Sequence, residues 1–586
     1  MKKINKLAII ASMALAGNTL NAQNLDWVVT LGGTEPDNGT DFVLDGSGNV
    51  YSIGMFEGTA DFDPGPGSAT YTAVGSTGQR NIFVSKLDAS GNFVWAKSFA
   101  ARSVNTNGYN PSIALDASGN VIITGLFQGT TDFDPGAGTF NMTSTGVGDM
   151  FICKLDNAGN FIWAKQVGGA SWQLPASLKT DANGSIYVSG SFEGTTDFDP
   201  SSGTFLLSSA SNSDVAGFVA KYNPSGTLGW AKQFGGTGFW DDCIALALDG
   251  SGAIYVTGCF DGTEDFDPGA GTLMLTSSSS SGGNQGFVVK LDNSGNLLWA
   301  KTPNGTGSNY LRGNSLVADA SGVYYTGSFS GIVDLDPGTG TYTISGNTTH
   351  AQVFISKLDA AGNFVWADSL TGDGGPNEGC GIALDAGGNV YITGYYNKTL
   401  DFDPGAAVYN VTTMMPGYTE TFINKFDGVG NFVWMKGFSN GNVYGKAVAL
   451  DASGDIYITG QLGGAWSVDF DPGAGVYPVT SAGWTDSYIC KLKTTTAAGI
   501  DVYSNESNLL AAYPNPVSGT LLLHKNSSDK LLVKMYAVSG ELVKTKQMEN
   551  AEETIDVSAL AAGMYFMYTE DAAGRKTSVQ KIQVVH

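Results

Sequence analysis

The chain is a succession of short apolar runs separated by turn-forming residues. In one stretch, four runs rich in β-branched and aromatic residues lie at Ser112–Leu115, Val121–Phe127, Met150–Leu155 and Phe161–Val167. Short Asp/Gly/Asn segments join the first run to the second and the third to the fourth, which suits tight hairpin turns. We call these predicted strands A to D. Four antiparallel strands in this order are typical of one propeller blade.

The four-strand pattern recurs seven times, and two markers agree on that number. A Trp opens the apolar part of strand D at intervals of 67 to 69 residues, and an Asp-Phe-Asp-Pro segment lies between strands B and C, as Asp-Leu-Asp-Pro in the fifth copy. The Trp markers are Trp27, Trp95, Trp163, Trp230, Trp299, Trp366 and Trp434. A regular repeat explains how a chain of 586 residues can avoid the size limit of a single core.

The two ends of the repeat array match each other. The seventh copy stops after its strand C at Tyr488–Leu492, and the missing Trp strand lies at Leu25–Gly33. An N-terminal strand that completes the last sheet would close a ring and cover its exposed edges. The sequence therefore predicts an all-β fold, with a seven-bladed β-propeller over residues 23–493 that is closed by an N-terminal strand.

Both termini have another composition. Three early lysines, an apolar run from Leu7 to Ala16 and a small-residue exit ending at Ala22 predict a secretory signal peptide over 1–22. No later run reaches the roughly 18 apolar residues of a membrane span, so we expect no transmembrane segment in the mature chain. Residues 494–508 form a polar linker, and 509–586 carry about seven alternating strands, which predicts a small Ig-like β-sandwich.

Two parts of the chain resemble known families. The runs Gly388–Gly394, Phe354–Asp359 and Phe364–Ala367 are similar to the bacterial SBBP β-propeller repeat over about residues 25–492, although the Asp-Phe-Asp-Pro excursion departs from that pattern. This resemblance implies a fold more than an activity.

The C-terminal segment resembles the type A sorting domain of the type IX secretion system. The resemblance rests on the opening Tyr513-Pro-Asn-Pro516 and the closing Lys-Ile-Gln-Val strand. It implies recognition by the type IX secretion machinery and transfer through the periplasm to the outer cell surface or the medium.

Charge and histidine content narrow the function. The net charge of −24 disfavours nucleic acid as a partner, because phosphate binding needs clustered Lys and Arg. The only histidines are His350, His524 and His586, so a Ser-His-Asp triad or a multi-histidine metal site in the repeats is not expected.

The Asp-Phe-Asp-Pro segments allow two interpretations. The Phe can pack between blades while each Asp accepts hydrogen bonds from turn amides, or the carboxylates can bind Ca²⁺, which prefers several oxygen ligands. The candidate calcium ligands are Asp61, Asp63, Asp132, Asp134, Asp197, Asp199, Asp265, Asp267, Asp334, Asp336, Asp401, Asp403, Asp469 and Asp471. Calcium is thus the one cofactor that the sequence suggests.

The loops between strand D and the next strand A carry a partial ring of aromatic residues. These are Tyr109, Trp172, Trp240, Tyr310 and Tyr444, with Trp172 and Trp240 as the main candidate ligand anchors. Aromatic faces suit sugars, and long variable loops on a rigid scaffold often carry binding sites. Simple packing of one blade on the next is the alternative.

Five cysteines complete the candidate chemistry. Cys153 and Cys490 occupy equivalent strand C positions in different repeats and fit small core residues. Cys243 and Cys259 lie on strands A and B of one repeat, and whether they form a disulfide stays open.

Together these patterns favour a secreted or cell-surface binding or adhesion protein, with an extracellular glycan or surface protein as partner. The alternative is a polysaccharide hydrolase or lyase that uses carboxylates in the central funnel, for which two acidic residues near the axis without equivalents in other blades would be the sign. A structural role in an extracellular matrix also stays open.

Overall fold

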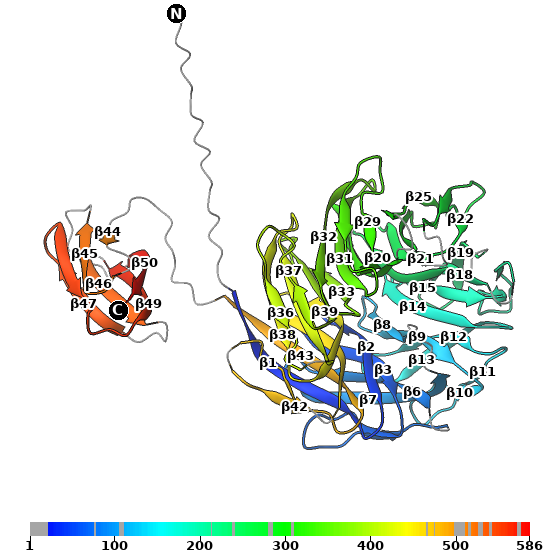
Figure 1. The fold of residues 1–586 in the computed structure, drawn as a ribbon. Coiled ribbons are helices and arrows are strands. Elements are labelled where there is room, and N and C mark those ends of the chain that lie inside the picture. Colours follow the sequence, from blue (N-terminus) through cyan, green and yellow to red (C-terminus); the bar gives the residue numbers. More distant parts are fainter. Residues whose placement is uncertain are drawn as a thin grey trace, which may run out of the picture. The chain divides into compact units, whose positions relative to one another are not determined.

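Seven antiparallel sheets of the same design follow one another along the chain (Figure 1). The computed structural model describes residues 21–75, 78–104, 110–211, 214–236, 241–278, 285–305, 310–415, 417–464, 467–473, 475–496, 510–513, 517–525, 531–537, 542–570 and 576–585. All the secondary-structure elements assigned within these residues are β-strands. Backbone contacts divide the chain into a unit over Gln23–Thr494 and a second one that contains Thr495–His586.

In each of these seven sheets the strands lie in the order A-B-C-D; A pairs antiparallel with B and B with C in all seven, and C pairs antiparallel with D in the first six. Strands A are β2 (Asp37–Leu44), β8 (Ser112–Leu115), β14 (Gln173–Thr180), β20 (Asp242–Leu248), β27 (Tyr310–Asp319), β33 (Glu378–Leu384) and β39 (Asn442–Leu450). Strands B are β3 (Val50–Phe56), β9 (Val121–Phe127), β15 (Ile186–Glu193), β21 (Ile254–Phe260), β28 (Gly322–Ser330), β34 (Val390–Asn397) and β40 (Ile456–Gly463).

Strands C and D complete the sheets. Strands C are β6 (Gln79–Leu87), β12 (Asp149–Leu155), β18 (Val215–Tyr222), β24 (Gln285–Leu291), β31 (Gln352–Asp359), β37 (Thr419–Phe426) and β43 (Thr485–Thr496). Strands D are β7 (Phe93–Val104), β13 (Phe161–Gly169), β19 (Leu228–Phe234), β25 (Leu297–Lys301), β32 (Phe364–Gly372), β38 (Phe432–Phe438) and, in the seventh sheet, β1 (Asn21–Gly33).

The turns explain why the strands begin and end where they do. In the second repeat, Asp116 Oδ1 accepts hydrogen bonds from the amides of Ser118 and Asn120, both at 2.9 Å, which closes the A–B turn. Gly119 has a φ of 76°, a conformation that glycine adopts without the strain of a side chain. The same Asp-x-x-Gly arrangement closes the C–D turn at Asp156 and Gly159.

A short hairpin, which we call the tab, interrupts each B–C connection. The sequence predicted a long loop there. The tabs are β4/β5 (Thr59–Asp61, Thr70–Thr72), β10/β11 (Thr130–Asp132, Asn141–Thr143), β16/β17 (Thr195–Asp197, Leu206–Ser208), β22/β23 (Thr263–Asp265, Met274–Thr276), β29/β30 (Ile332–Asp334, Thr343–Ser345), β35/β36 (Thr399–Asp401, Asn410–Thr412) and β41/β42 (Ser467–Asp469, Pro478–Thr480). Within the described residues, the first, third, fifth, sixth and seventh tabs pair with the end of the preceding strand D. In the fifth repeat the pairing runs through the short β26 (Asn304–Gly305).

Tryptophans of strand D link neighbouring sheets. The indole of Trp95 donates to the carbonyl of Asn157 in the next C–D turn at 3.0 Å, and Trp299 makes the same contact with Ala360 at 3.1 Å. Trp27 on β1 repeats it with Ala89 of the first repeat, at 3.2 Å. The N-terminal strand therefore contacts the first repeat through the same indole-to-carbonyl bond that Trp95, Trp230 and Trp299 make to the repeats that follow them.

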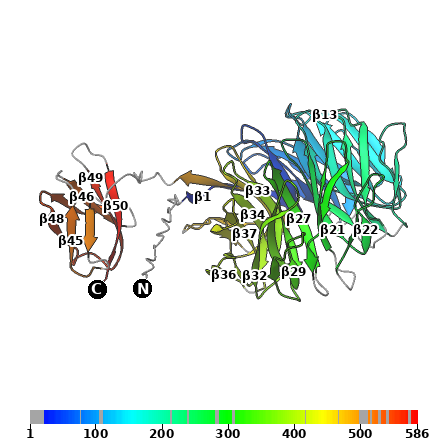
Figure 2. The same cartoon turned by 90° about the horizontal axis from the view of Figure 1, so that it is seen from above.

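The N-terminal strand joins the last sheet beside β43, as Figure 1 shows for the blue and gold strands. Leu31 on β1 is fully buried. Strand β39 also packs against β2, so the row of strands A continues from the seventh repeat to the first. Figure 2 shows the larger unit turned by 90°. The fold of Gln23–Thr494 is thus a propeller-like array of seven sheets.

The C-terminal unit consists of two small sheets around one core. One sheet contains β44 (Leu510–Tyr513), β45 (Thr520–Lys525) and β48 (Glu552–Asp556); the other contains β46 (Leu531–Ala537), β47 (Leu542–Met548), β49 (Gly563–Glu570) and β50 (Lys576–Val584). Val533, Met535 and Ile582 are fully buried between them. These alternating strands agree with the two-layer organisation expected from the sequence.

Three sequence predictions concern residues at the margins of this description. The predicted signal peptide and most of the linker lie outside the described residues, apart from 21–22 and 494–496. Within the described part of the chain, no helix has the length and apolar character needed to cross a bilayer. Cys243 and Cys259 are free, buried thiols, so the disulfide left open by the sequence is not formed.

Candidate functional site

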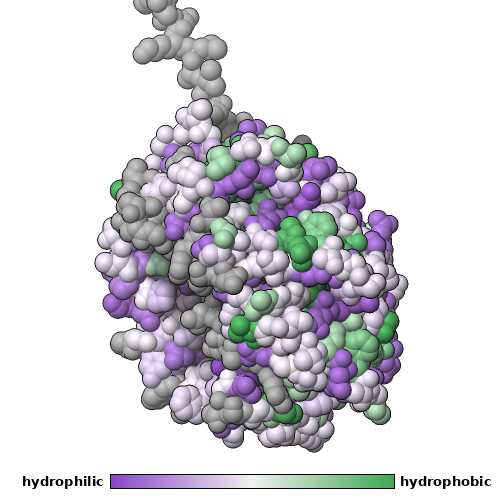
Figure 3. Space-filling model, turned by 90° about the vertical axis from the view of Figure 1, so that its right-hand side faces the viewer, coloured by the Kyte–Doolittle hydropathy of each residue, from purple (hydrophilic) through white to green (hydrophobic). Residues whose placement is uncertain are grey.

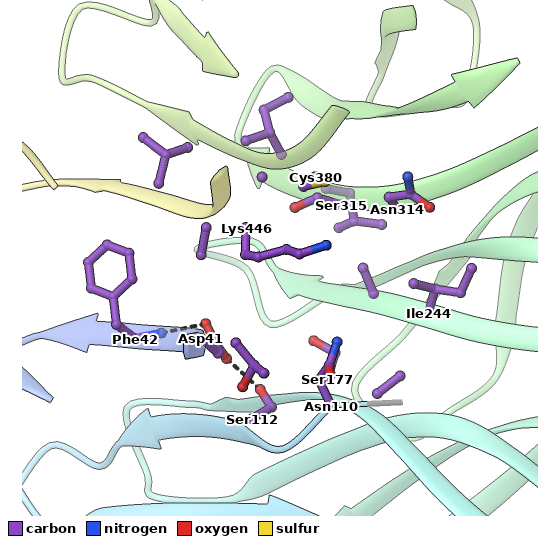
Figure 4. Close-up of a pocket in the computed structure, with 18 of the residues that line it drawn as sticks. Asp41, Phe42, Asn110, Ser112, Ser177, Ile244, Asn314, Ser315, Cys380 and Lys446 are labelled. Carbon is purple, nitrogen blue, oxygen red and sulfur yellow. Dashed lines mark hydrogen bonds between the residues drawn. The ribbon is translucent and has the colours of Figure 1, made fainter. Parts of the chain in front are cut away.

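A cavity of about 370 Å³ lies where the seven strands A meet. All seven strands A contribute to its lining, from Thr40 on β2 to Ala449 on β39, so the cavity is at the centre of the array. Figure 4 shows the strands around it and the side chains that face the central space. Its volume is in the lower part of the roughly 300–1,000 Å³ range of ligand pockets.

Six of the seven strands A have a register shift at the same position, and the remaining one, β8, begins directly after that position. In β2 the pairing with β3 shifts between Gly39 and Asp41, which leaves Thr40 unpaired, and the same shift occurs in five further strands A. The equivalent residues are Thr40, Pro111, Ala176, Ile244, Asn314, Cys380 and Lys446, which all line the cavity. No residue type recurs among these seven positions. Bulges turn side chains toward new directions and are frequent beside functional sites.

The cavity concentrates basic side chains in a strongly acidic protein. Lys179, Arg312 and Lys446 line it together with Asp41 and Glu378, whereas the whole chain has a net charge of −24. The guanidinium of Arg312 pairs with the carboxylate of Asp242 at 3.6 Å, and Asp242 is almost fully buried.

The two lysines are less engaged. The ammonium of Lys446 lies 5.2 Å from the centre of the Tyr395 ring, and Figure 4 shows its side chain extended into the central space. Within the described residues, neither Lys179 nor Lys446 has a hydrogen bond or an ion pair through its ammonium group. Both ammonium groups are therefore available to an anionic ligand.

Asp41, by contrast, is tied to the wall. Its Oδ2 accepts from Ser112 Oγ at 2.7 Å and from the amide of Ile113 at 3.3 Å, and its Oδ1 accepts from the amide of Phe42 at 2.8 Å (Figure 4). Thr40 adds a bond from its hydroxyl to the Pro111 carbonyl at 2.9 Å. These contacts join the first repeat to the second, which assigns Asp41 a positioning role.

Burial controls the remaining reactive group of the wall. It raises the pKa of the Cys380 thiol to about 12, although the nearby Lys446 ammonium acts in the opposite direction. Cys380 is therefore a neutral thiol at physiological pH, and the nucleophilic thiolate is scarce.

The predicted aromatic ring is only partly described, and its described members lie outside the cavity lining. Tyr109 and Trp240 fall outside the described residues. Trp172 packs against Leu126 and Leu174 beside Gly148, and Tyr444 meets Tyr395 edge to face at 5.0 Å. Tyr310 is the first residue of β27 and is partly buried. A ligand role for these rings stays a prediction.

The Asp-Phe-Asp-Pro segments form the ends of the tab hairpins. Asp132 Oδ1 accepts from the amides of Asp134 at 3.0 Å and Phe140 at 2.8 Å, and Asp134 Oδ1 accepts from the amide of Gly136 at 2.8 Å. Phe133 is fully buried and packs on Phe127 and Phe151. The first Asp of every repeat makes the same pair of bonds, with donors two and eight residues later.

These bonds are the ones that the turn-capping interpretation predicts. In the described ranges, no group of three or more His, Cys, Asp or Glu is placed to hold a metal ion. Calcium binding by the second oxygen of each carboxylate, together with backbone carbonyls, stays a prediction.

The cavity residues were not predicted from the sequence, because the long and variable loops were the expected place for a binding site. Lys179, Arg312 and Lys446 lie within strands, and the equivalent positions of the other repeats hold different residue types. The usable signal was the loss of agreement between repeats along strand A, from the position of Arg312 to that of Lys179, two residues before the Asp of the A–B turn. Elsewhere on the surface, apolar side chains are scattered among polar ones, as Figure 3 shows for one face.

Comparison with known proteins adds context for both units. An uncharacterised WD repeat-containing protein of Acanthamoeba polyphaga mimivirus is 25% identical over 514 residues, which cover 74% of this chain and 36% of that protein. This chain thus spans about a third of the relative's length.

Two solved structures also show similarity. A fungal alcohol oxidase in complex with copper gives a TM-score of 0.34 at 13% identity, covering 97% of this chain and 100% of that one. PorZ, a bacterial surface component of the type IX secretion system of Porphyromonas gingivalis, gives 0.22 at 10% identity, covering 95% and 100%. TM-scores this low do not establish a common fold.

Residues 511–585 match the family described as the secretion system C-terminal sorting domain. This range coincides with the two-sheet C-terminal unit. It agrees with the resemblance seen in the Pro-Asn-Pro opening and the closing strand. The chain therefore carries a C-terminal sorting domain of the type IX secretion kind, which directs export to the cell surface or the medium.

Proposed function

We propose that the chain is a type IX secretion cargo whose repeats form a seven-bladed propeller, closed by β1, that binds an acidic glycan in its central cavity. The cavity carries the proposal, because Lys179 and Lys446 line it and, within the described residues, neither ammonium group has a hydrogen bond or an ion pair. The surrounding Ser and Asn side chains, such as Ser177, Ser315 and Asn110, offer hydrogen bonds to sugar hydroxyls. A carboxylated sugar meets both requirements.

The contrast between the negative charge of the whole chain and the two ammonium groups at the cavity supports a small anionic ligand. The protein's overall negative charge repels extended polyanions such as nucleic acid, whereas a local pair of ammonium groups attracts a single carboxylate at short range. A uronic acid residue at the end of a glycan fits this combination better than a long acidic chain does.

Ligand screening tests this proposal. The purified mature propeller should bind uronic acid oligosaccharides and not their neutral hexose counterparts, and the affinity should fall as salt rises because the contact is ionic. Equal binding of neutral and acidic oligosaccharides would contradict the ligand class.

An enzymatic function is the second candidate, because Asp41 and Glu378 line the cavity and the positions equivalent to Asp41 in other repeats carry Ser, Ala or Gly. Asp41 already accepts three hydrogen bonds, which favours a positioning role over proton transfer. Hydrolysis or lysis of an acidic polysaccharide that Glu378→Gln abolishes, without loss of binding, would favour the enzyme.

Export is tested separately. Without residues 509–586 the propeller should accumulate in the periplasm, while a chain with the sorting domain intact reaches the surface or the medium. Normal surface delivery of the truncated chain would contradict the role of this domain in export.

A further inference from the structure

The junction between the fifth and sixth repeats contains a second cavity, of about 380 Å³, at the outer part of the array. Strand D of the fifth repeat lines it with Trp366 and Asp368, and the sixth repeat contributes Asp403 and the C–D turn around Gly430. Tyr342 from the tab of the fifth repeat completes one wall. None of these residues takes part in the central cavity.

The repeat pattern shows what is missing at this junction. The second residue after the Trp marker is lysine in five repeats, namely Lys97, Lys165, Lys232, Lys301 and Lys436. In the fifth repeat this position is Asp368. The fifth junction thus has a shorter side chain of opposite charge where most others have a lysine.

The lysines show how that space is normally used. The side chains of Lys97, Lys232 and Lys301 lie against the glycine of the next C–D turn, beside the Trp ring. Lys436 extends further, and its ammonium donates to the carbonyl of Pro472 in the next Asp-Phe-Asp-Pro segment at 3.3 Å. A lysine side chain is therefore the ordinary occupant of this position in the fold.

The indole of Trp366 also differs from its equivalents. Trp27, Trp95, Trp230 and Trp299 each donate to a carbonyl of the following repeat. The Nε1 atom of Trp366 is buried, and in the described residues it has no hydrogen-bond partner. Within the described residues, this junction therefore lacks the bond that links the Trp ring to the following repeat at four others.

We infer that this cavity binds a primary alkylammonium group, such as the side chain of a lysine residue, between the carboxylates of Asp368 and Asp403 and the rings of Trp366 and Tyr342. The ammonium group of the bound ligand would take the place of the lysine that five other repeats carry in their own sequence. Paired carboxylates attract the charge, and the aromatic faces favour an organic cation with an alkyl chain over a hydrated metal ion.

The protonation state of Asp368 predicts how ammonium binding depends on pH. Burial, with a further contribution from Asp403, raises the pKa of Asp368 to about 7, and Tyr342 faces the same carboxyl. Asp368 gains its negative charge as the pH rises through 7, so ammonium binding should be stronger at pH 8 than at pH 6.

Titration calorimetry of the mature full chain with n-butylammonium tests the inference, with n-butanol as the neutral comparison. Wild-type protein should bind n-butylammonium and ignore n-butanol, and Asp368→Asn should weaken binding at least tenfold. Asp368→Lys restores the repeat pattern and should abolish binding while the protein stays folded.

A gain of binding provides the matched control. Lys301→Asp places a carboxylate opposite Asp336 at the preceding junction, where it should create a second ammonium site. Unchanged affinity in both Asp368 variants would overturn the inference, as would calcium binding at Asp368 that n-butylammonium does not displace.

Two further probes identify the source of the ammonium. A short capped glycine peptide with one central lysine, and the same peptide with Nε-acetyl-lysine, extend the comparison. Tighter binding of the lysine peptide than of n-butylammonium supports a protein partner, and the reverse order supports a free amine. Equal binding of the acetylated and unmodified peptides would overturn the inference, because the acetyl group removes the charge.

Discussion

The tabs and the central cavity obey opposite rules. In the tabs, the same aspartate accepts the same two amide bonds in all seven repeats, and a buried Phe or Leu follows it. At the cavity, the seven equivalent bulge positions hold seven different residue types. What repeats serves the fold, and what departs from the repeat is free to serve a ligand. The lesson is that a repeat protein's binding residues are found by looking for the positions where its repeats disagree.

Removing the N-terminal strand should have the largest effect, because it takes a complete strand D from the seventh sheet. Deletion of Leu25–Gly33 removes buried Leu31 and the Trp27 contact to Ala89 and exposes the edge of β43. We expect aggregation or loss of the folded monomer, measured by size-exclusion chromatography and thermal melting. A monomer with unchanged melting would show that β1 does not close the array.

The next effect in size concerns the tab core. Phe133→Ala should lower the free energy of unfolding by about 3–5 kcal/mol, because it removes a fully buried ring from between Phe127 and Phe151. Denaturant unfolding measures the change. A loss below about 1 kcal/mol would contradict the assignment of the tab as a structural element.

The tab carboxylates should matter less. Asp132→Ala removes two hydrogen bonds to turn amides and should cost about 1–3 kcal/mol. The same experiment tests calcium, since an ion bound only to the native state raises its stability. If millimolar calcium raises the melting temperature of wild type and a chelator reverses it, the calcium interpretation holds; no shift leaves turn capping alone.

The smallest expected effect is a pH dependence of stability at the junction between the seventh and first repeats, which carries charged residues where another junction carries neutral ones. Gln352 and Asn377 hydrogen-bond to each other at 3.3 Å between the fifth and sixth repeats, whereas the equivalent positions between the seventh and first hold Asp486 and Asp37. Burial raises the pKa of Asp37 to about 8, with a further contribution from Asp486, and burial raises that of Asp486 to about 6.

Raised carboxyl pKa values favour the protonated form in the folded state. The stability contributed by Asp37 is full below pH 4 and is lost as the pH rises toward 8, because the folded protein must then release a proton that it holds more tightly. Asp37→Asn should therefore melt higher than wild type at pH 8.5 and similarly at pH 4. The exposed Asp373→Asn serves as control; an equal rise in both variants would assign the effect to net charge.

The sequence was most informative where local chemistry repeats. The Trp and Asp-Phe-Asp-Pro markers located every sheet, and the capping role of Asp132 followed from Asx-turn chemistry. The tab pairing was not predictable, because strands such as Thr130–Asp132 have three residues, and tabs of this kind pair with a strand of the preceding repeat. Lys446 was not predicted for a related reason, because it lies at the register shift between Gly445 and Ala447. Lys179 is paired regularly with Tyr187, so nothing local separates it from an ordinary strand residue.

The central claim is that departures from the repeat carry function. The direct test is binding of a uronic acid oligosaccharide to the double variant Lys179→Ala/Lys446→Ala, with Lys97→Gln/Lys165→Gln as a matched loss of two strand D lysines outside the cavity. Affinity should fall at least tenfold in the first variant with melting within about 1 °C of wild type, and stay unchanged in the second. Full affinity in the cavity variant, or an equal loss in both, would contradict the account.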